Sequence, residues 1–106
     1  MTPGRNVYIP NLVFHNYEDA KQYGQLVQLS KGSIDQIDTE EVTKRFREKL
    51  AEAHQDDFIL MSGSPLLNVI AVGIILDMYG TVNMLQWNGI LQEYFKIEFT
   101  LEWEIV

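Results

Sequence analysis

The feature that most constrains this chain is a helix-forming segment, residues 65–79, whose side chains are apolar nearly all round. Only Asn68 and Asp77 within it are strongly polar. A helix without a polar face cannot leave one side in water, so a single sheet face is not enough to cover it. We therefore expect a sheet beneath this helix and a further covering surface, for which a second copy of the protein is the simplest candidate.

Strand-forming segments flank the apolar helix on both sides. Residues 58–61 are apolar without alternation, which is typical of a strand covered on both faces. A Ser-Gly-Ser-Pro turn follows, in which Ser64 is the expected N-cap and Pro65 occupies the first helical position, where its missing N–H costs nothing. Gly80 ends the helix and residues 81–87 form the next strand, so residues 57–87 predict the centre of an α/β domain.

The first half of the chain predicts two more strand–helix units. Residues 7–9 form a short strand that stops at Pro10-Asn11, and Asn16 begins a short helix that ends at a left-handed Gly24. Residues 25–30 form a half-buried strand. Asp38 and Glu41 then have capping-box spacing, and the helix after them carries an apolar stripe. The members of that stripe are Val42, Phe46, Leu50 and Ala53.

The last part of the chain predicts a hairpin with an over-long second strand. Asn88-Gly89 is the signal for a two-residue type I′ turn. Residues 90–106 then alternate, with one face expected to be core, and would extend roughly 55 Å at ~3.3 Å per residue. Because a domain of this size has a radius of gyration of only ~13 Å, the end of this strand must bend, bulge, pair with the N-terminal strand or reach another subunit, and we expect a homo-oligomer. The expected oligomer interface consists of Phe99, Leu101, Trp103 and Ile105.

The order of elements is β-α-β-α-β-α-β-β, which predicts one domain spanning residues 1–106. Alternating strands and helices indicate a small, mixed, mostly parallel, Rossmann-like α/β sheet with a C-terminal antiparallel hairpin. The length of 106 residues fits a single core.

Composition and charge exclude several classes of function. The absence of cysteine excludes disulfides, thiolate metal sites and cysteine nucleophiles. No signal peptide is evident, and the longest near-apolar run is far short of the ~20 residues that cross a bilayer, so we expect a cytoplasmic protein without membrane contact. Residues 51–106 carry eight acidic side chains against Lys96 alone. Repulsion from phosphates therefore disfavours binding of double-stranded nucleic acid, while a basic protein partner and a merely solvated acidic surface both stay open.

The Ser62-Gly63-Ser64 turn is the best candidate site. It lies at the carboxyl end of a buried strand and opens a helix, where free N–H groups and the helix dipole favour a small anionic or nucleotide-type ligand. Ordinary helix capping explains the same residues. If the first, third and fourth strands are parallel neighbours, the same edge also gathers further hydrogen-bonding and aromatic side chains, namely Asn11, Trp87, Asn88 and, from the following loop, His15.

The residues give no catalytic or metal-binding signature. The spacing at Gly63-Ser64 fails that of a nucleophile elbow, and His15 and His54 lack metal-ligand spacing. Asp56 and Asp57 are interpreted as solvated loop acids. We expect no metal, no cofactor and no enzymatic activity, with a small hydrolase or transferase as the third alternative.

Three segments carry a resemblance to a known group of proteins. They are residues 17–24 (YEDAKQYG), 57–65 (DFILMSGSP) and 82–87 (VNMLQW). Together they resemble small accessory proteins of tailed bacteriophages, which implies a phage gene product acting in the host cytoplasm. The leading hypothesis is a homo-oligomeric, non-enzymatic accessory protein that binds a ligand at residues 62–64. The alternative is an interaction module or inhibitor of a host protein, acting through Glu98, Glu102 and Glu104.

Overall fold

A computed structural model describes residues 4–13, 15–31 and 37–101. Strands and helices alternate as the sequence predicts, except that the first helix is a 3₁₀ helix. The elements are β1 (Asn6–Ile9), η1 (Glu18–Tyr23), β2 (Gln25–Gln28), α1 (Thr39–Leu50), β3 (Phe58–Leu60), α2 (Pro65–Tyr79), β4 (Thr81–Asn88) and β5 (Glu93–Thr100).

The five strands form one mixed sheet in the order β2-β1-β3-β4-β5. The first four strands are parallel and β5 is antiparallel to β4, which confirms the mostly parallel sheet and the C-terminal hairpin. β1, β3 and β4 are neighbours, as expected. The order differs from the Rossmann order, in which the first strand lies between the second and the fourth, so the Rossmann-like prediction is not confirmed.

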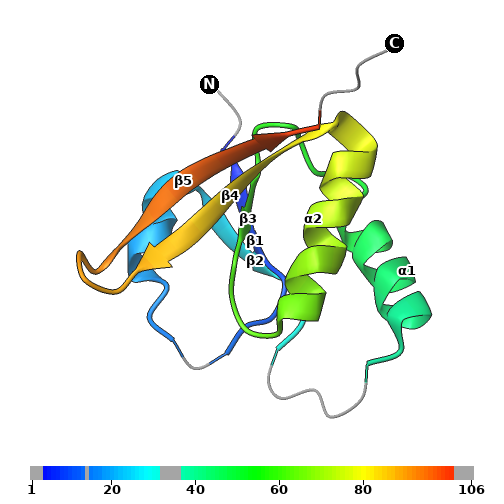
Figure 1. Ribbon diagram of the computed structural model, residues 1–106, viewed down its shortest axis with the longest axis horizontal. Helices are drawn as coiled ribbons and strands as arrows, with labels where there is room; N and C mark the ends of the chain where they lie inside the picture. The colour runs from blue at the N-terminus through cyan, green and yellow to red at the C-terminus, as the bar shows by residue number, and fades with distance from the viewer. Residues whose placement is uncertain (1–3, 14, 32–36, 102–106) are drawn as a thin grey trace.

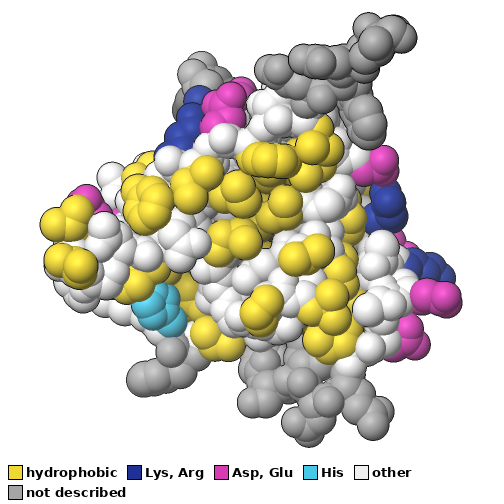
Figure 2. Space-filling view, viewed as in Figure 1, with side chains coloured by type: hydrophobic (Ala, Val, Ile, Leu, Met, Phe, Trp, Pro, Cys, Tyr) yellow, Lys and Arg dark blue, Asp and Glu magenta, His cyan; other side chains and the backbone are white. Residues whose placement is uncertain are grey.

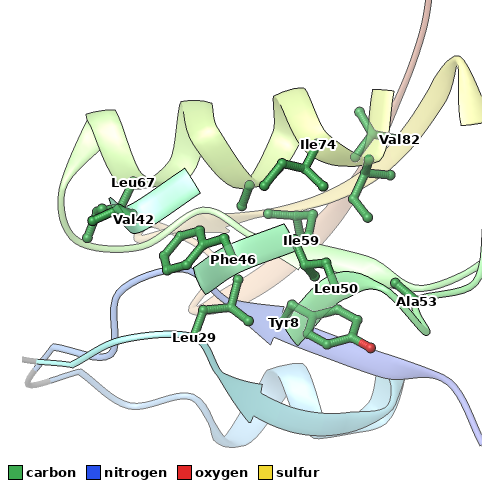
Figure 3. Close-up of a cluster of buried hydrophobic side chains, with 12 residues drawn as sticks. Tyr8, Leu29, Val42, Phe46, Leu50, Ala53, Ile59, Leu67, Ile74 and Val82 are labelled. Atoms are coloured by element: carbon green, nitrogen blue, oxygen red, sulfur yellow. The ribbon is translucent and has the colours of Figure 1, made fainter. Parts of the chain in front are cut away.

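The two faces of the sheet are covered unequally. α1 and α2 lie on one face and η1 lies on the other (Figure 1). The helical face carries the larger core, in which the expected α1 stripe of Val42, Phe46 and Leu50 packs with Ala53 against Ile59 of β3 (Figure 3). Phe46, Leu50 and Ile59 are almost completely buried. The stripe predicted from helical spacing is therefore confirmed.

Side-chain capping fixes the start of α1. The Asp38 carboxylate accepts the N–H groups of Glu40 and Glu41 at 3.1 and 3.2 Å, as the sequence predicts.

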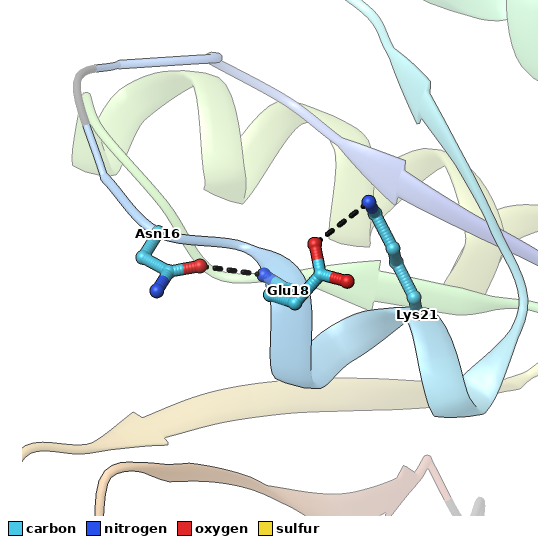
Figure 4. Close-up of polar contacts among 3 residues, drawn as sticks. All are labelled: Asn16, Glu18 and Lys21. Carbon is cyan, nitrogen blue, oxygen red and sulfur yellow. Dashed lines mark hydrogen bonds and ion pairs between the residues drawn. The ribbon is translucent and has the colours of Figure 1, made fainter.

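The connection through η1 begins with the expected hydrogen bond to the Asn16 side chain, but it ends differently from the expected helix. Asn16 Oδ1 accepts the Glu18 N–H at 2.9 Å, and Lys21 Nζ pairs with Glu18 at 2.7 Å (Figure 4). Gly24 has φ +157° and ψ −171°, so the expected left-handed helix cap is wrong. A Cβ at this position would collide with the carbonyl oxygen of Arg5. Glycine is therefore needed because β1 approaches the start of β2 closely.

The apolar helix α2 has the predicted bounds. Pro65 occupies its first turn, and Gly80 ends it in the left-handed conformation at φ +73°. Its side chains toward the sheet are buried, among them Leu67, Ala71 and Ile74.

The loop before β3 corrects the interpretation of Asp57. Its side chain is buried rather than solvated. The carboxylate accepts the N–H groups of Asn6 at 3.0 Å and His54 at 2.9 Å. Asp56 is exposed, as expected. Asp57 therefore joins the start of β1 to the loop that enters β3, and is not a solvated acid.

The β4–β5 hairpin is wider than predicted. The terminal pair of the ladder is Asn88 with Glu93, so the turn contains four residues and the predicted two-residue type I′ turn is wrong. The Asn88 side chain accepts the N–H groups of Ile90 and Leu91 at 3.0 and 3.1 Å, and Gln92 takes the positive φ of 56°. The asparagine amide thus builds a larger turn. Of the expected strand 90–106, residues 93–100 are strand, and residues 102–106 lie outside the described residues.

None of the helices in the described part of the chain has the length and apolar character needed to cross a membrane. Within the described ranges, no three His, Cys, Asp or Glu side chains are grouped so as to hold a metal ion.

Candidate functional site

The predicted site lies where the strand order of the sheet reverses. β1 is followed in the chain by β2 on one side, whereas β3 leads through α2 to β4 on the other. Asn11 follows β1 and Ser62 follows β3, so both lie at the carboxyl edge of this reversal. Such a switch point is where open α/β sheets bind ligands. The strand order therefore brings Asn11 and Ser62 to the same edge of the sheet, as expected.

Asn11 lies directly against Gly63. A Cβ on Gly63 would come within 2.6 Å of Asn11 Nδ2 and 2.8 Å of its Cβ, and Gly63 has φ +71°. Asn11 is buried, and Ser30 Oγ donates to the Pro10 carbonyl at 2.7 Å and lies 3.3 Å from Asn11 Oδ1. Gly63 is thus required by the backbone conformation and by the neighbouring asparagine.

The two serines of the turn have different surroundings. Ser62 Oγ is 2.7 Å from Tyr17 Oη, and the Ser62 N–H donates to Asn68 Oδ1 at 3.3 Å. Ser64 is the N-cap residue of α2, as expected, but its side chain makes no capping hydrogen bond. The carboxamide of Asn68, one turn into the helix, instead binds the turn through Ser62.

An aromatic cluster borders this edge. His15 lies edge-on to Tyr17 and Trp87, with ring centroids 5.1 Å apart in both cases, and Trp87 lies 4.9 Å from Tyr94. His15 is exposed, whereas Tyr17 and Tyr94 are buried. Burial, and after it the neighbouring Tyr17 and Asp19, raise the pKa of Tyr94 from 10.0 to about 12.

The sequence-predicted residues are therefore brought together only in part. Asn11, Ser62 and Gly63 form one contact group, and His15 and Trp87 form another that Tyr17 connects to Ser62. Asn88 is engaged in the hairpin turn. Sequence reasoning missed Tyr17 and Tyr94. Tyr94 lies on the same side of β5 as Lys96, which strand alternation alone would leave in solvent, but η1 covers it.

The chemistry available at this edge is stacking and hydrogen bonding. The Ser62 hydroxyl has a tyrosine as its partner rather than a histidine, so the serine is not paired with a general base.

Four of the surface cavities formed by the described residues are not lined by Ser62, Gly63 or Ser64. One of about 440 Å³ is lined by Gly73, Leu76, Asp77, Gly80 and Leu101, where the end of α2 meets the end of β5. Another of about 410 Å³ lies at the opposite edge of the sheet from the turn, and Glu98 and Lys96 are among its lining residues. The remaining two border α1.

The structure has a broad apolar surface that the sequence did not predict as exposed. Hydrophobic side chains gather across the side of the molecule that shows α2 and the β4–β5 hairpin (Figure 2). We define the apolar face by eight residues of these elements. They are Leu66, Val69, Gly73 and Leu76 of α2, with Phe95, Ile97 and Phe99 of β5 and the adjoining Leu101.

The β5 members of the apolar face were expected to be core. Phe99 pairs with Val82 and Ile97 with Met84, so they do point to the helical side of the sheet. Within the described residues, however, α2 packs over β3 and β4 and does not cover this side of β5. Phe95, Ile97 and Phe99 are consequently 41, 37 and 45% exposed, and their prediction as core is wrong. Of the predicted oligomer interface, Phe99 and Leu101 belong to this face, while Trp103 and Ile105 lie outside the described residues.

Comparison with known proteins gives one match. The family model described as Phage Pam3 gp32-like protein matches residues 5–101, which is most of the chain. No curated protein and no solved structure matches it. The match confirms the resemblance to bacteriophage proteins that the sequence motifs indicate. The chain belongs to the Phage Pam3 gp32-like protein family.

Proposed function

We propose that this phage accessory protein acts in the host cytoplasm by binding another protein through its apolar face, and that it is not a catalyst. The observation that carries this proposal is the exposure of six large apolar side chains on neighbouring elements. Their exposed fractions run from 37 to 65%, the largest being that of Val69. Contiguous exposed apolar patches of several hundred Å² mark interaction surfaces.

The size of the apolar face fits a protein interface. With roughly 150–250 Å² per large side chain, these exposures leave on the order of 500 Å² of apolar surface. A standard interface buries about 800 Å² on each partner, of which about 56–65% is apolar. Burying 500 Å² contributes on the order of 10 kcal/mol before the costs of association are met.

A capture experiment in infected cells tests the proposal. Val69→Lys places a charge at the most exposed position of the apolar face, and Leu91→Lys is its matched control. Leu91 is also apolar and 63% exposed, but it lies in the hairpin turn. We expect the wild-type protein and Leu91→Lys to retain the same bound proteins, whether phage, host or further copies of this chain. The amount of protein captured by Val69→Lys should fall at least about tenfold, because a buried unpaired charge costs more than about 1.4 kcal/mol of binding free energy.

The opposite result is equally clear. If Val69→Lys and Leu91→Lys capture the same proteins in the same amounts as wild type, the apolar face is not the binding surface.

A second candidate function is ligand binding at the switch point. It is supported by the exposed His15 ring beside Trp87, the Tyr17–Ser62 contact next to them, and a Ser64 hydroxyl that does not cap α2. An aromatic platform beside hydroxyls suits a nucleotide-type anion.

Calorimetric titration with mono-, di- and cyclic nucleotides tests this second function. His15→Ala and Ser64→Ala are suitable variants, whereas Gly63→Val is not, because its side chain would clash with Asn11. Heat of binding that both variants weaken would support the ligand site. Flat titrations with the whole panel, or binding that neither variant alters, would refute it.

A further inference from the structure

We infer that the partner of the apolar face is a second copy of this chain, with α2 of each subunit lying over β5 of the other. This inference rests on the proposed function, since it names the occupant of the same surface.

The apolar face has a raised half and a bare half. α2 and β5 meet where the Leu101 N–H donates to the Gly80 carbonyl at 2.9 Å, and they diverge from that point (Figure 1). α2 forms a ridge above β3 and β4. β5 forms a lower strip whose Phe95, Ile97 and Phe99 side chains are exposed and are not covered by a helix of the described part of the chain.

A two-fold axis makes these two halves complementary. If the axis lies in the plane of the face and bisects the angle between α2 and β5, it places each ridge along the bare strip of the other subunit. Both contacts form at once, as an isologous interface requires. Each apolar helix gains the second cover that its composition demands.

Distances along the two elements bring Val69 over Ile97. Val69 lies eleven residues before Gly80, which is about 16 Å along a helix at ~1.5 Å per residue. Ile97 lies four residues before Leu101, which is about 13 Å along a strand at ~3.3 Å per residue. Both distances are measured from the point where α2 meets β5. The two-fold axis therefore places Val69 of one subunit close to Ile97 of the partner subunit.

Gly73 lies on the ridge of α2. A Cβ there would meet nothing within 4 Å among the described residues, so no contact within the described chain requires glycine. A glycine inside a helix is less favourable than alanine, because its backbone loses more conformational freedom on folding. Its place on the apolar face allows a second subunit to approach the helix backbone closely.

Charge does not oppose this contact, although the chain carries a net charge of −7. All eight residues of the apolar face are uncharged. Asp77, the acid of α2, pairs with Arg47 of α1 at 3.2 Å. Asp77 borders the apolar face beside Gly73 and Leu76, where Arg47 offsets its charge, and the other acids of the described chain lie outside the eight residues of the face.

The outer edge of β5 is partly occupied, which favours packing through the face over pairing of edge strands. The Tyr94 N–H donates to Asp19 Oδ2 at 2.6 Å, and Tyr23 Oη donates to the Tyr94 carbonyl at 3.1 Å. These side chains of η1 satisfy backbone groups that a neighbouring strand would otherwise bind.

Sedimentation of the purified 106-residue chain tests the arrangement. We expect wild type and the control Leu91→Lys to approach twice the chain mass of 12.3 kDa at micromolar concentrations. Val69→Lys and Ile97→Glu should each remain monomeric, with dissociation constants raised at least about tenfold. Circular dichroism establishes that each variant is folded.

An equimolar mixture of Val69→Lys and Ile97→Glu provides the decisive arm. In the mixed dimer, one contact joins the new lysine to the new glutamate and the other keeps Val69 against Ile97. The mixture should therefore form dimers at concentrations where each variant alone is monomeric. In an alternative dimer, α2 would contact α2, or β5 would contact β5. The mixture would then place each new charge against an unchanged apolar side chain, and dimer formation would not be restored.

Three results would overturn the inference: a monomeric wild-type chain, folded variants that dimerise as wild type does, or a mixture without recovery. If the wild-type chain is monomeric but capture from infected cells still depends on Val69, the proposed function stands with a different partner. If the wild-type chain is monomeric and Val69→Lys also leaves capture unchanged, both the dimer and the proposed function are contradicted.

Discussion

Leu101 and Gly80 are joined by a 2.9 Å hydrogen bond from the Leu101 N–H to the Gly80 carbonyl. This bond ties the end of the last strand to the end of the apolar helix. Because Gly80 takes the left-handed φ of +73°, the chain turns there into β4 and leaves β5 beside α2 rather than beneath it. The apolar face follows from that geometry, since one helix of 15 residues cannot cover both β4 and β5.

Gly63→Ala should lower the free energy of unfolding by about 2 kcal/mol or more. The residue has a left-handed φ of +71°, and a Cβ would press against Asn11 Nδ2 at 2.6 Å. Chemical denaturation measures the loss. In the double variant with Asn11→Ala, part of the loss should be relieved, giving a coupling of at least about 0.5 kcal/mol. Strict additivity would show that the contact with Asn11 plays no part.

Gly73→Ala should have the opposite sign. A Cβ at this position meets nothing within 4 Å in the described structure, so the substitution should stabilise the isolated subunit by about 0.5–1 kcal/mol through helix propensity. Denaturation at concentrations low enough to keep the chain monomeric isolates this effect. Gly80→Ala serves as the control and should destabilise, because alanine does not readily adopt its φ of +73°. A destabilised Gly73→Ala monomer would mean that the chain itself packs against this position.

Asp57→Ala should cost about 2–3 kcal/mol of unfolding free energy. The substitution leaves the N–H groups of Asn6 and His54 without their carboxylate acceptor in a partly buried location. The adjacent Asp56→Ala is the matched control and should change stability by less than about 0.5 kcal/mol, because Asp56 is exposed. Equal effects of the two substitutions in urea denaturation would contradict the assigned role.

Tyr94 should make the protein sensitive to alkaline pH. Its pKa is raised to about 12 in the folded state, chiefly by burial, whereas the ordinary value is 10.0. Its contribution is therefore complete below pH 10 and is lost as the pH rises toward 12, because the unfolded chain ionises first. The loss should reach about 1 kcal/mol near pH 11. Tyr94→Phe should have a flatter stability profile between pH 9.5 and 12, and an unchanged slope would refute this.

Local signals made much of the fold predictable. The bounds of α2 followed from Pro65 and Gly80, the start of α1 from Asp38, and the α1 core stripe from helical spacing. The turn at Asn88 was mispredicted because the asparagine side chain binds two N–H groups and widens the loop, an interaction that competes with the type I′ conformation.

The candidate site was less predictable, since it depends on which element covers which strand. Alternation placed Phe95, Ile97 and Phe99 on one side of β5, but alternation cannot say whether a helix lies above that side. The burial of Tyr94 was equally unpredictable from alternation, because η1, which covers it, comes from a distant part of the sequence. The all-apolar composition of α2 was the available signal that cover was lacking.

Disulfide trapping between subunits tests the central claim most directly, because the chain has no cysteine of its own. Val69→Cys and Ile97→Cys are purified separately, mixed in equal amounts and oxidised gently. If α2 lies over β5 of the other subunit, with Cα atoms within about 7 Å, the mixture should give a covalent dimer containing one chain of each variant. Neither variant alone should cross-link to a comparable extent, nor should Leu91→Cys mixed with Ile97→Cys. Cross-linking of Val69→Cys with itself, or none in the mixture, would contradict the account.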